Sequence, residues 1–318
     1  MANVIVYNYV SRDAQVHLEE FRSEFQAAFM MDTTEQWARE TGLTIQTTNL
    51  KVTLPIPLSA AGYVERKGDI IYRRLAERSF SFTPRVWQDG FAEFAEIIEA
   101  PDFLGFAVEP ANMAAAAAQL PNELVSAAIE ANPTQASFDN VTFFNTAHPY
   151  NLLDTATGTY SNDITGAGTD LTAANIGIAR QNFRKINGPN GKPLGVRFKG
   201  IIIPPALEEQ AARLAQQDTI IQVLGSGFGS VDNVRTKGLK YWVSDQLTND
   251  IKWYPVGEKI GMYPYVTTDR GAPEMLILGK GNSALYETQG KVGAQSKLQV
   301  DSALAFPQLM QRWAGTGP

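Results

Sequence analysis

The sequence predicts an α+β fold arranged as two closely connected domains. Three observations lead to this prediction. At 318 residues the chain exceeds the length that one compact domain usually reaches. Apolar residues follow a helical spacing between Leu18 and Phe29 and then alternate with polar residues over 44–58. Finally, a helix, a buried strand and a second helix follow one another over 172–217, which is the order of a mixed α and β domain.

The composition excludes several classes of protein. With 44% hydrophobic and 19% charged residues, the chain is expected to fold. A net charge of −6 argues against a surface that coats itself in nucleic acid along its whole length. The absence of cysteine excludes disulfides, thiolate catalysis and cysteine-bound metals. We see no signal peptide and no apolar run long enough to cross a bilayer, so we expect no membrane association.

The first third of the chain is predicted to hold a helix and an extended segment. Five apolar residues spaced by three, four, three and one form one face of a helix within 15–40. Asp32 or Thr33 is a candidate cap for a second helix. The alternation over 44–58 favours extended structure, with prolines at its end that suit an edge. The helical apolar residues are Leu18, Phe21, Phe25, Ala28 and Phe29.

Residues 63–90 are predicted to form a long two-stranded hairpin, because small, charged and aromatic residues alternate there between glycines. The segment has six basic and four acidic residues, a net of +2 in a chain of net −6. A basic arm on an acidic body suits contact with an acidic neighbour. An ordinary solvated hairpin explains the charges equally well. The candidate inter-subunit contact residues are Arg66, Lys67, Arg73, Arg74, Arg78 and Arg85.

A long helical segment is predicted over 91–132, where helix formers dominate. Pro110 and Pro121 lie within it, so we expect a kink or a restart of the helix at each proline. The segment 154–170 is almost free of apolar residues and is predicted to be a loop.

The second half of the chain is predicted to alternate helices and strands. A helix over 172–186 is followed by a glycine- and proline-rich turn, a buried strand over 196–203 and a helix over 206–217. Shorter strands are expected at 241–243, 253–254, 275–278 and 297–300, the last two returning to the first domain.

No catalytic, cofactor or metal site is predicted. The only histidines are His17 and His148, and neither has a neighbouring cluster of Asp, Glu or His at the spacing of metal ligands. The Gly-x-Ser-x-Gly motif that presents a catalytic serine is absent, and we favour a structural role for His148.

Two glycine-rich segments imitate nucleotide-binding motifs and fail in detail. In Gly225–Ser230 the third glycine falls one place early and no helical pattern follows, so we predict a flexible surface loop. In Gly188–Pro193 a proline replaces the serine or threonine that would hold magnesium, so we predict a turn.

Two stretches of the sequence resemble the major head subunit family of Mu-like phages. The first runs from Leu120–Leu124 through an apolar helix to Val141–Pro149, which ends in paired phenylalanines and His-Pro. The second combines the turn at Gly191–Gly195 with the hydrophobic strand and Leu-Glu helix of Ile201–Glu208. Both occur in the order that the family shows.

The resemblance implies an HK97-like major capsid fold with an N-terminal arm, an extended β-hairpin loop, a peripheral domain with a long spine helix, and an axial domain. The implied divisions are 1–62 for the arm and lead-in, 63–90 for the extended loop, 91–133 for the spine helix, 134–270 mainly for the axial domain, and 271–318 for the return to the peripheral domain.

The function implied by the resemblance is that of a non-enzymatic major capsid protein. Copies of the chain would form the pentamers and hexamers of an icosahedral shell that encloses a phage genome. The implied partners are other copies of the chain, scaffold, portal and decoration proteins, and packaged DNA touched non-specifically at the inner surface. The chain would assemble in the host cytoplasm and reside in the virion. The alternatives are another virion protein, such as a tail or decoration subunit, or a nucleotide-binding α/β enzyme built on 225–230.

Overall fold

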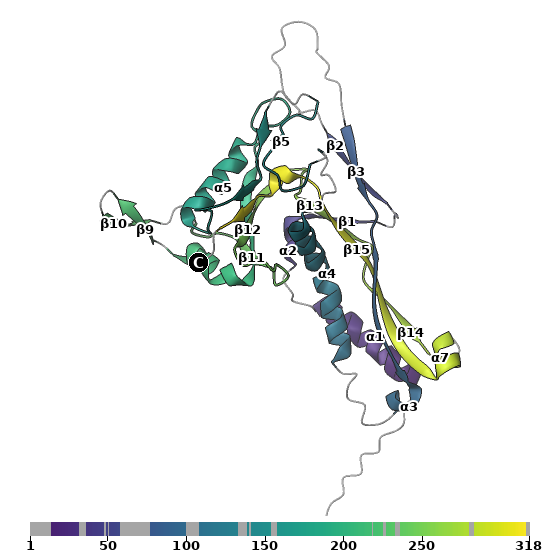
Figure 1. Cartoon of the computed structure of the whole chain (residues 1–318). Coiled ribbons are helices and arrows are strands. Elements are labelled where there is room, and N and C mark those ends of the chain that lie inside the picture. Colours follow the sequence, from purple (N-terminus) through teal and green to yellow (C-terminus); the bar gives the residue numbers. More distant parts are fainter. Residues whose placement is uncertain are drawn as a thin grey trace, which may run out of the picture.

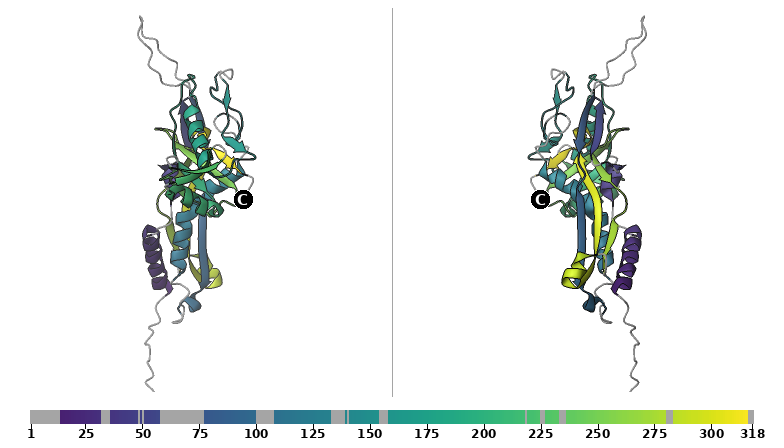
Figure 2. Two further views of the ribbon diagram at one scale, coloured as in Figure 1. Left: turned by 90° about the vertical axis from the view of Figure 1, so that its left-hand side faces the viewer. Right: turned by 90° about the vertical axis from the view of Figure 1, so that its right-hand side faces the viewer.

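The computed structural model has a long lobe and a rounder lobe that together form a flat, angular molecule (Figure 1). We call the long one the peripheral lobe and the rounder one the axial lobe, using as labels the terms that the resemblance supplies. Seen edge-on, the molecule is narrow (Figure 2). The structure describes residues 14–31, 36–47, 49, 51–57, 77–99, 108–132, 139, 141–153, 158–217, 219–224, 227–232, 236–279 and 283–315.

A five-stranded sheet built around one long strand, β15 (Lys291–Leu304), forms the peripheral lobe. The first part of β15 pairs antiparallel with two strands, and its last five residues pair antiparallel with a third, which in turn pairs in parallel with the fourth. Two of the short strands predicted from the sequence lie within this sheet. Its other strands are β4 (Val86–Phe94), β14 (Glu274–Leu278), β13 (Tyr265–Asp269) and β1 (Leu43–Gln46).

Helices pack against this sheet through their apolar faces. In α1 (Ala14–Met31) the side chains of Leu18, Phe21 and Phe25 are buried, which confirms the predicted helix. They pack against the sheet and the long helix in one apolar cluster. Asp32 and Thr33 lie outside the described residues, and the next helix begins after Gln36. The shorter helices are α2 (Trp37–Thr41), α3 (Ala95–Ile98) and α7 (Ala284–Gln289).

The long helix α4 (Glu109–Ala131) is continuous, so of the kink or restart expected at each proline, the restart does not occur. Pro110 lies in the first turn, where its missing N–H has no helical partner to lose. Pro121 lies inside the helix and is buried. The side chain of Gln36 donates a hydrogen bond to the Ala118 carbonyl at 2.9 Å, so a group from outside the helix satisfies a carbonyl in the turn that the proline disturbs.

The helical part of 91–132 is shorter than predicted. Residues 91–94 belong to β4, and α3 follows before the long helix begins at Glu109. Residues 91–94 fit the peripheral sheet better than a helix, because Phe91 pairs opposite the buried Ala294 of β15.

The axial lobe is a five-stranded sheet covered by helices on one face and by the end of α4 on the other. α5 (Ala173–Lys185) begins at its cap Thr172, whose side chain accepts from the Asn175 N–H. The predicted helices and the buried strand of this region are confirmed. In sheet order the strands are β11 (Tyr241–Val243), β8 (Arg197–Ile203), β12 (Lys252–Glu258), β16 (Arg312–Ala314) and β7 (Asp163–Thr165), and the covering helices are α5, η3 (Pro205–Leu207) and α6 (Glu208–Gln216).

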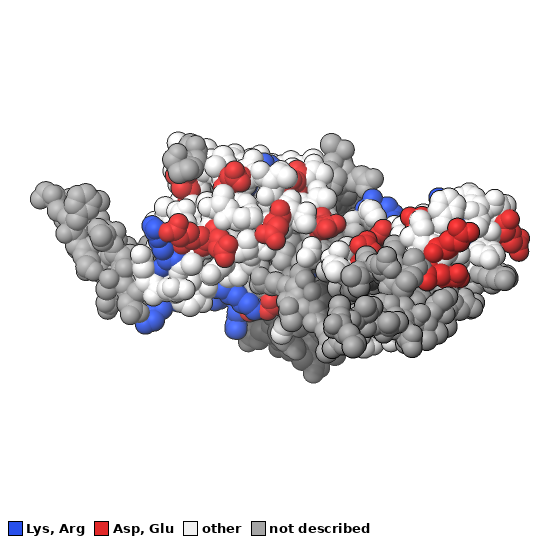
Figure 3. All heavy atoms as spheres, turned by 90° about the horizontal axis from the view of Figure 1, so that it is seen from below, with Lys and Arg blue, Asp and Glu red and all other residues white. Residues whose placement is uncertain are grey.

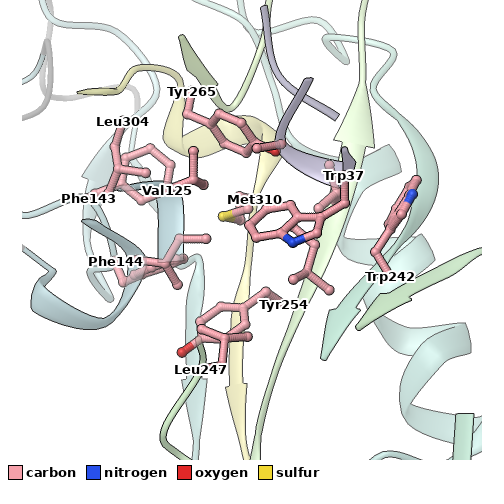
Figure 4. Close-up of a cluster of buried hydrophobic side chains, with 14 residues drawn as sticks. Trp37, Val125, Phe143, Phe144, Trp242, Leu247, Tyr254, Tyr265, Leu304 and Met310 are labelled. Atoms are coloured by element: carbon pink, nitrogen blue, oxygen red, sulfur yellow. The ribbon is translucent and has the colours of Figure 1, made fainter. Parts of the chain in front are cut away.

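One apolar cluster joins the two lobes. Figure 4 shows Trp37, Val125, Tyr254, Tyr265 and Met310 converging from helices and strands of both lobes. All five side chains are at most 2% exposed. Burial of this much aromatic and aliphatic surface favours one fixed arrangement of the lobes.

The remaining elements are short. The segment 154–170 was predicted to be a loop, but its described part contains β6 (Thr159–Tyr160) and β7, the latter held by its parallel pairing with β16. The others are β2 (Val52–Pro57), β3 (Glu77–Phe82), β5 (His148–Pro149), β9 (Thr219–Leu224), β10 (Gly227–Asp232) and η4 (Pro307–Leu309). Within the described ranges, no helix has the length and apolar character needed to cross a membrane.

Candidate functional site

The first candidate surface is a two-stranded ribbon, β2 and β3, on the side of the molecule away from α3 and α7 (Figure 1). Its register follows the apolar pattern, because Val52 lies opposite Phe82 and Leu54 lies opposite Phe80. The polar Thr53 faces Ser81. A hairpin was predicted within 63–90, but the observed pairing begins at residue 52, and the strand after the ribbon, β4, belongs to the peripheral sheet.

Most of the predicted contact residues lie outside the described residues. These are Arg66, Lys67, Arg73 and Arg74 in the segment 58–76, which connects β2 to β3. Arg78 lies on β3 opposite Ile56 in the register of the ribbon. Their role at a subunit boundary stays a prediction.

Arg85, the sixth predicted contact residue, is bound within its own chain. Its Nε and Nη2 donate to the two carboxylate oxygens of Asp301 on β15, each at 3.1 Å. Its guanidinium also lies 4.9 Å from the ring centre of Trp87, whose indole N–H donates to the Val300 carbonyl at 2.8 Å. This bidentate contact fixes the start of β4, directly after the ribbon, to the long strand of the peripheral sheet.

The second candidate surface is acidic and covers the far end of the peripheral lobe. Acidic side chains gather on the face seen from below in Figure 3. The ion pair Arg22–Glu19 at 3.8 Å neutralises little of this charge. Phe94 and Ile97, at the end of β4 and on α3, are 48% and 41% exposed beside it. The exposed carboxylates on α1, α3 and α7 are Glu19, Glu20, Glu24, Glu96, Glu99 and Glu287.

A polar contact at Glu40 fixes α2 to the edge of the axial sheet. Its carboxylate accepts hydrogen bonds from Lys240 and from the indole N–H of Trp242, the latter at 2.6 Å. These hydrogen bonds, with a smaller Coulombic effect of Lys199, lower the pKa of Glu40. Together with the apolar cluster of Figure 4, this contact holds the two lobes at a fixed angle.

His148 is a structural residue in this fold. Its side chain is fully buried, with Nδ1 2.5 Å from Asp139 Oδ2 and Nε2 3.0 Å from the Phe143 carbonyl. Asn162 completes the network by donating to carbonyls of Phe143, Pro307 and Met310. Sequence spacing could not show these partners, because the fold brings them together. Buried without access to solvent, the imidazole orders the chain around the paired phenylalanines.

The glycine-rich segment 225–230 is not a dinucleotide-binding motif. β9 and β10 pair antiparallel, with Gly227 opposite Leu224, so a second strand follows where a helix is needed. The flexible loop predicted here is therefore corrected to a strand pair. The turn predicted at Gly188–Pro193 is confirmed by the Gly188 N–H, which donates to the Lys192 carbonyl at 2.8 Å. Among the described residues, no cluster of His, Cys, Asp and Glu is suited to a metal ion.

The sequence analysis missed a basic hollow on the axial lobe. Arg180, Arg184 and Lys185 of α5 line it together with Arg197 of β8. The four-residue spacing of Arg180 and Arg184 on a helix was visible in the sequence. Their approach to Arg197 depends on how α5 packs on β8.

Two family models match the chain. The model of the Mu-like prophage major head subunit gpT matches residues 15–170, and the model described as phage capsid protein matches residues 97–292. The chain belongs to the phage capsid protein family. Its function is that of a major capsid protein of a tailed phage, as the resemblance of its motifs predicted. No curated protein matches the sequence.

The chain is similar in structure to proteins from phage particles and to an encapsulin. The chain in the procapsid of bacteriophage JBD30 matches with a TM-score of 0.51 and 14% identity, over 94% of this capsid protein and 74% of that chain. The chain of Microbacterium phage Oxtober96 matches with a TM-score of 0.53 and 13% identity, over 87% and 90%. The SrpI encapsulin of Synechococcus elongatus PCC 7942 matches with a TM-score of 0.52 and 7% identity, over 88% and 86%. At these identities the similarity establishes the HK97-like fold and nothing finer.

Proposed function

We propose that this capsid protein assembles with copies of itself into the pentamers and hexamers of a closed icosahedral shell, and that its role is structural and not catalytic. The observation that supports this most is the separation of the β2–β3 ribbon from the acidic end of the molecule. The β2–β3 ribbon, which leads into the basic segment 58–76, and the acidic end at α1, α3 and α7 lie at opposite ends of one flat molecule (Figures 1 and 2).

Such a separation suits a ring of identical subunits. In a rotational ring each copy presents one surface to the next copy and a different surface to the previous one, so the two surfaces must be complementary. A basic arm and an acidic end meet this condition, and opposite charge guides the encounter and fixes the register. The individual contacts are weak, but their sum over a closed shell resists the pressure of a packaged genome.

Charge reversal tests the proposed contact. We expect the Arg73→Glu/Arg74→Glu variant to lose most of its assembled particles, measured by sedimentation and negative-stain microscopy of the full-length chain. The matched control Lys192→Glu/Lys297→Glu makes the same change in charge at exposed sites away from the ribbon. Restoring particles with Glu96→Lys/Glu99→Lys would identify the acidic end as the partner. Normal particles in the Arg73 and Arg74 variant would contradict the contact.

The same proposal extends to the other components of a phage head. We place the assembled chain in the virion after assembly in the host cytoplasm, with scaffold, portal and decoration proteins as partners and packaged DNA touched at the inner surface. A complete lack of self-assembly by the full-length chain, with and without the proteins encoded beside it, would contradict the proposed function.

A further inference from the structure

A basic hollow lies at one end of the axial sheet, beside the first residue of β8. It has a volume of about 550 Å³, and it adjoins a second hollow of about 510 Å³ through the shared residues Arg197 and Glu258. Among the described residues, Glu258 is the only acidic one that lines either hollow. The cations that line the two hollows are Arg180, Arg184, Lys185, Arg197, Lys199 and Lys259.

Four of these cations have no carboxylate partner in the described part of the chain. Arg180, Arg184, Lys185 and Arg197 form no ion pair there, although Arg197 lies opposite Glu258 in the strand register. The other two, Lys199 and Lys259, donate to backbone carbonyls. A chain of net charge −6 therefore concentrates unpaired positive charge at this place.

Arg180 gives the strongest indication that the hollow suits an anionic group. Its guanidinium lies 4.9 Å from the ring centre of Phe198, and its Nε is buried without a hydrogen-bond partner. Burial also lowers the pKa of Arg180, because no nearby carboxylate compensates for lost solvent. A guanidinium that is partly buried and has no carboxylate partner loses hydration without compensation, and an arriving carboxylate or phosphate would supply that compensation.

The surroundings favour a protein partner over nucleic acid. Ile260 is fully exposed and Tyr263 is 36% exposed at the second hollow, and Ile178 of α5 is 45% exposed. Arginine combined with exposed aliphatic and aromatic side chains is typical of the centre of a protein interface. Contacts to a nucleic-acid backbone require cations and give no role to exposed aliphatic groups.

A matching acidic surface lies at the other end of the same sheet. The register places Arg197 and Glu258 at the start of β8, whereas Asp245 follows the end of β11 and Glu208 begins the helix after the end of β8. Glu208 and Asp245 are both exposed, as is Asp250 before β12. Seven residues of β8 separate the two ends, roughly 20 Å.

We propose that the basic hollow of one copy receives the acidic end of the axial sheet of the next copy, at Glu208, Asp245 and Asp250. This inference rests on the proposed assembly into rings, and it adds the axial contact to the contact made by the ribbon. The two ends carry opposite charge on one lobe, as a head-to-tail ring of copies requires.

Disulfide trapping tests the pairing directly, because the chain has no cysteine. In Lys185→Cys/Asp245→Cys the two thiols lie too far apart to bond within one copy. Mild oxidation of sedimented particles or capsomers should give a ladder of covalent species up to the ring size, whereas each single-cysteine variant gives at most dimers. If the unsubstituted chain forms particles but the double variant gives no ladder, the axial contact is wrong and the proposed shell function stands.

Charge exchange and stability give independent readouts. Arg184→Glu/Lys185→Glu should lower the particle yield about tenfold, and Glu208→Lys/Asp245→Lys should restore it. Particles that form normally but package less DNA would instead assign the hollow to nucleic acid and overturn the inference. In the unassembled chain, Arg180→Met should raise the melting temperature by about 2 °C, because it removes an unpaired desolvated charge. A lower melting temperature would show that Arg180 stabilises its own subunit.

Discussion

Replacing Arg85 with methionine should destabilise the unassembled subunit. In the structure its guanidinium donates to both carboxylate oxygens of Asp301 at 3.1 Å and lies over the ring of Trp87. Methionine keeps most of the aliphatic packing and removes the charge. Asp301, whose side chain is 11% exposed, then loses its cation and keeps the hydrogen bond from the Ser302 N–H at 2.9 Å.

The expected loss is about 1 to 2 kcal/mol in the free energy of unfolding. A bidentate, charge-assisted contact to a nearly buried carboxylate contributes at the upper end of the range for hydrogen bonds. The Arg85 side chain is 62% exposed, so solvent screens part of that contribution. The value lies below that expected for a fully buried ion pair.

Urea unfolding of the unassembled chain, followed by tryptophan fluorescence, measures this loss. A double-mutant cycle with Asp301→Asn should give a coupling energy of about 1 kcal/mol. Arg270→Met is the control, because Arg270 is exposed and its side chain bonds the neutral side chain of Gln299, so the change should alter stability by less than about 0.5 kcal/mol. An Arg85→Met chain as stable as the parent, but impaired in assembly, would refute the intrachain anchor and place Arg85 at a subunit boundary.

Three further changes test the fold. Hydrogen bonds lower the pKa of Glu40 from 4.5, so its contribution to stability is present above pH 4.5 and is lost as the pH falls through the folded pKa. Glu40→Gln should therefore flatten the plot of unfolding free energy against pH in that range. An unchanged plot would contradict the contact. Ile202→Ala on β8, where the side chain is fully buried, should cost about 2 to 5 kcal/mol in chemical unfolding. A loss below about 1 kcal/mol would mean that the site is not close-packed. Gly293→Val should cost about 2 kcal/mol or more, because its Cβ would collide with the Phe91 backbone on β4, whereas Gln295→Ala two residues further along should be tolerated.

The sequence predicted elements whose signal is local. The apolar spacing from Leu18 to Phe29 located α1, and the run Ile201–Ile203 located β8, a buried strand of the axial sheet. The motifs near Pro121 and His148, which occur in the order that the family shows, indicated the family and through it the fold.

Features that depend on distant residues could not be read from the sequence. The helix continues through Pro121 with support from Gln36, far away in the chain. His148 finds Asp139 and Asn162 through the fold. The contact between Arg85 and Asp301 spans 216 positions, and no local pattern indicates it. The basic hollow likewise exists only once α5 packs on β8.

The most direct test of the central claim is an electron cryomicroscopy reconstruction of particles formed by the full-length chain. We expect a closed shell of pentamers and hexamers in which segment 58–76 of one copy lies over the acidic end of its neighbour, and in which the basic hollow meets Glu208 and Asp245 of the next axial lobe. Tubes, isolated trimers or compact soluble dimers in place of shells would contradict the account.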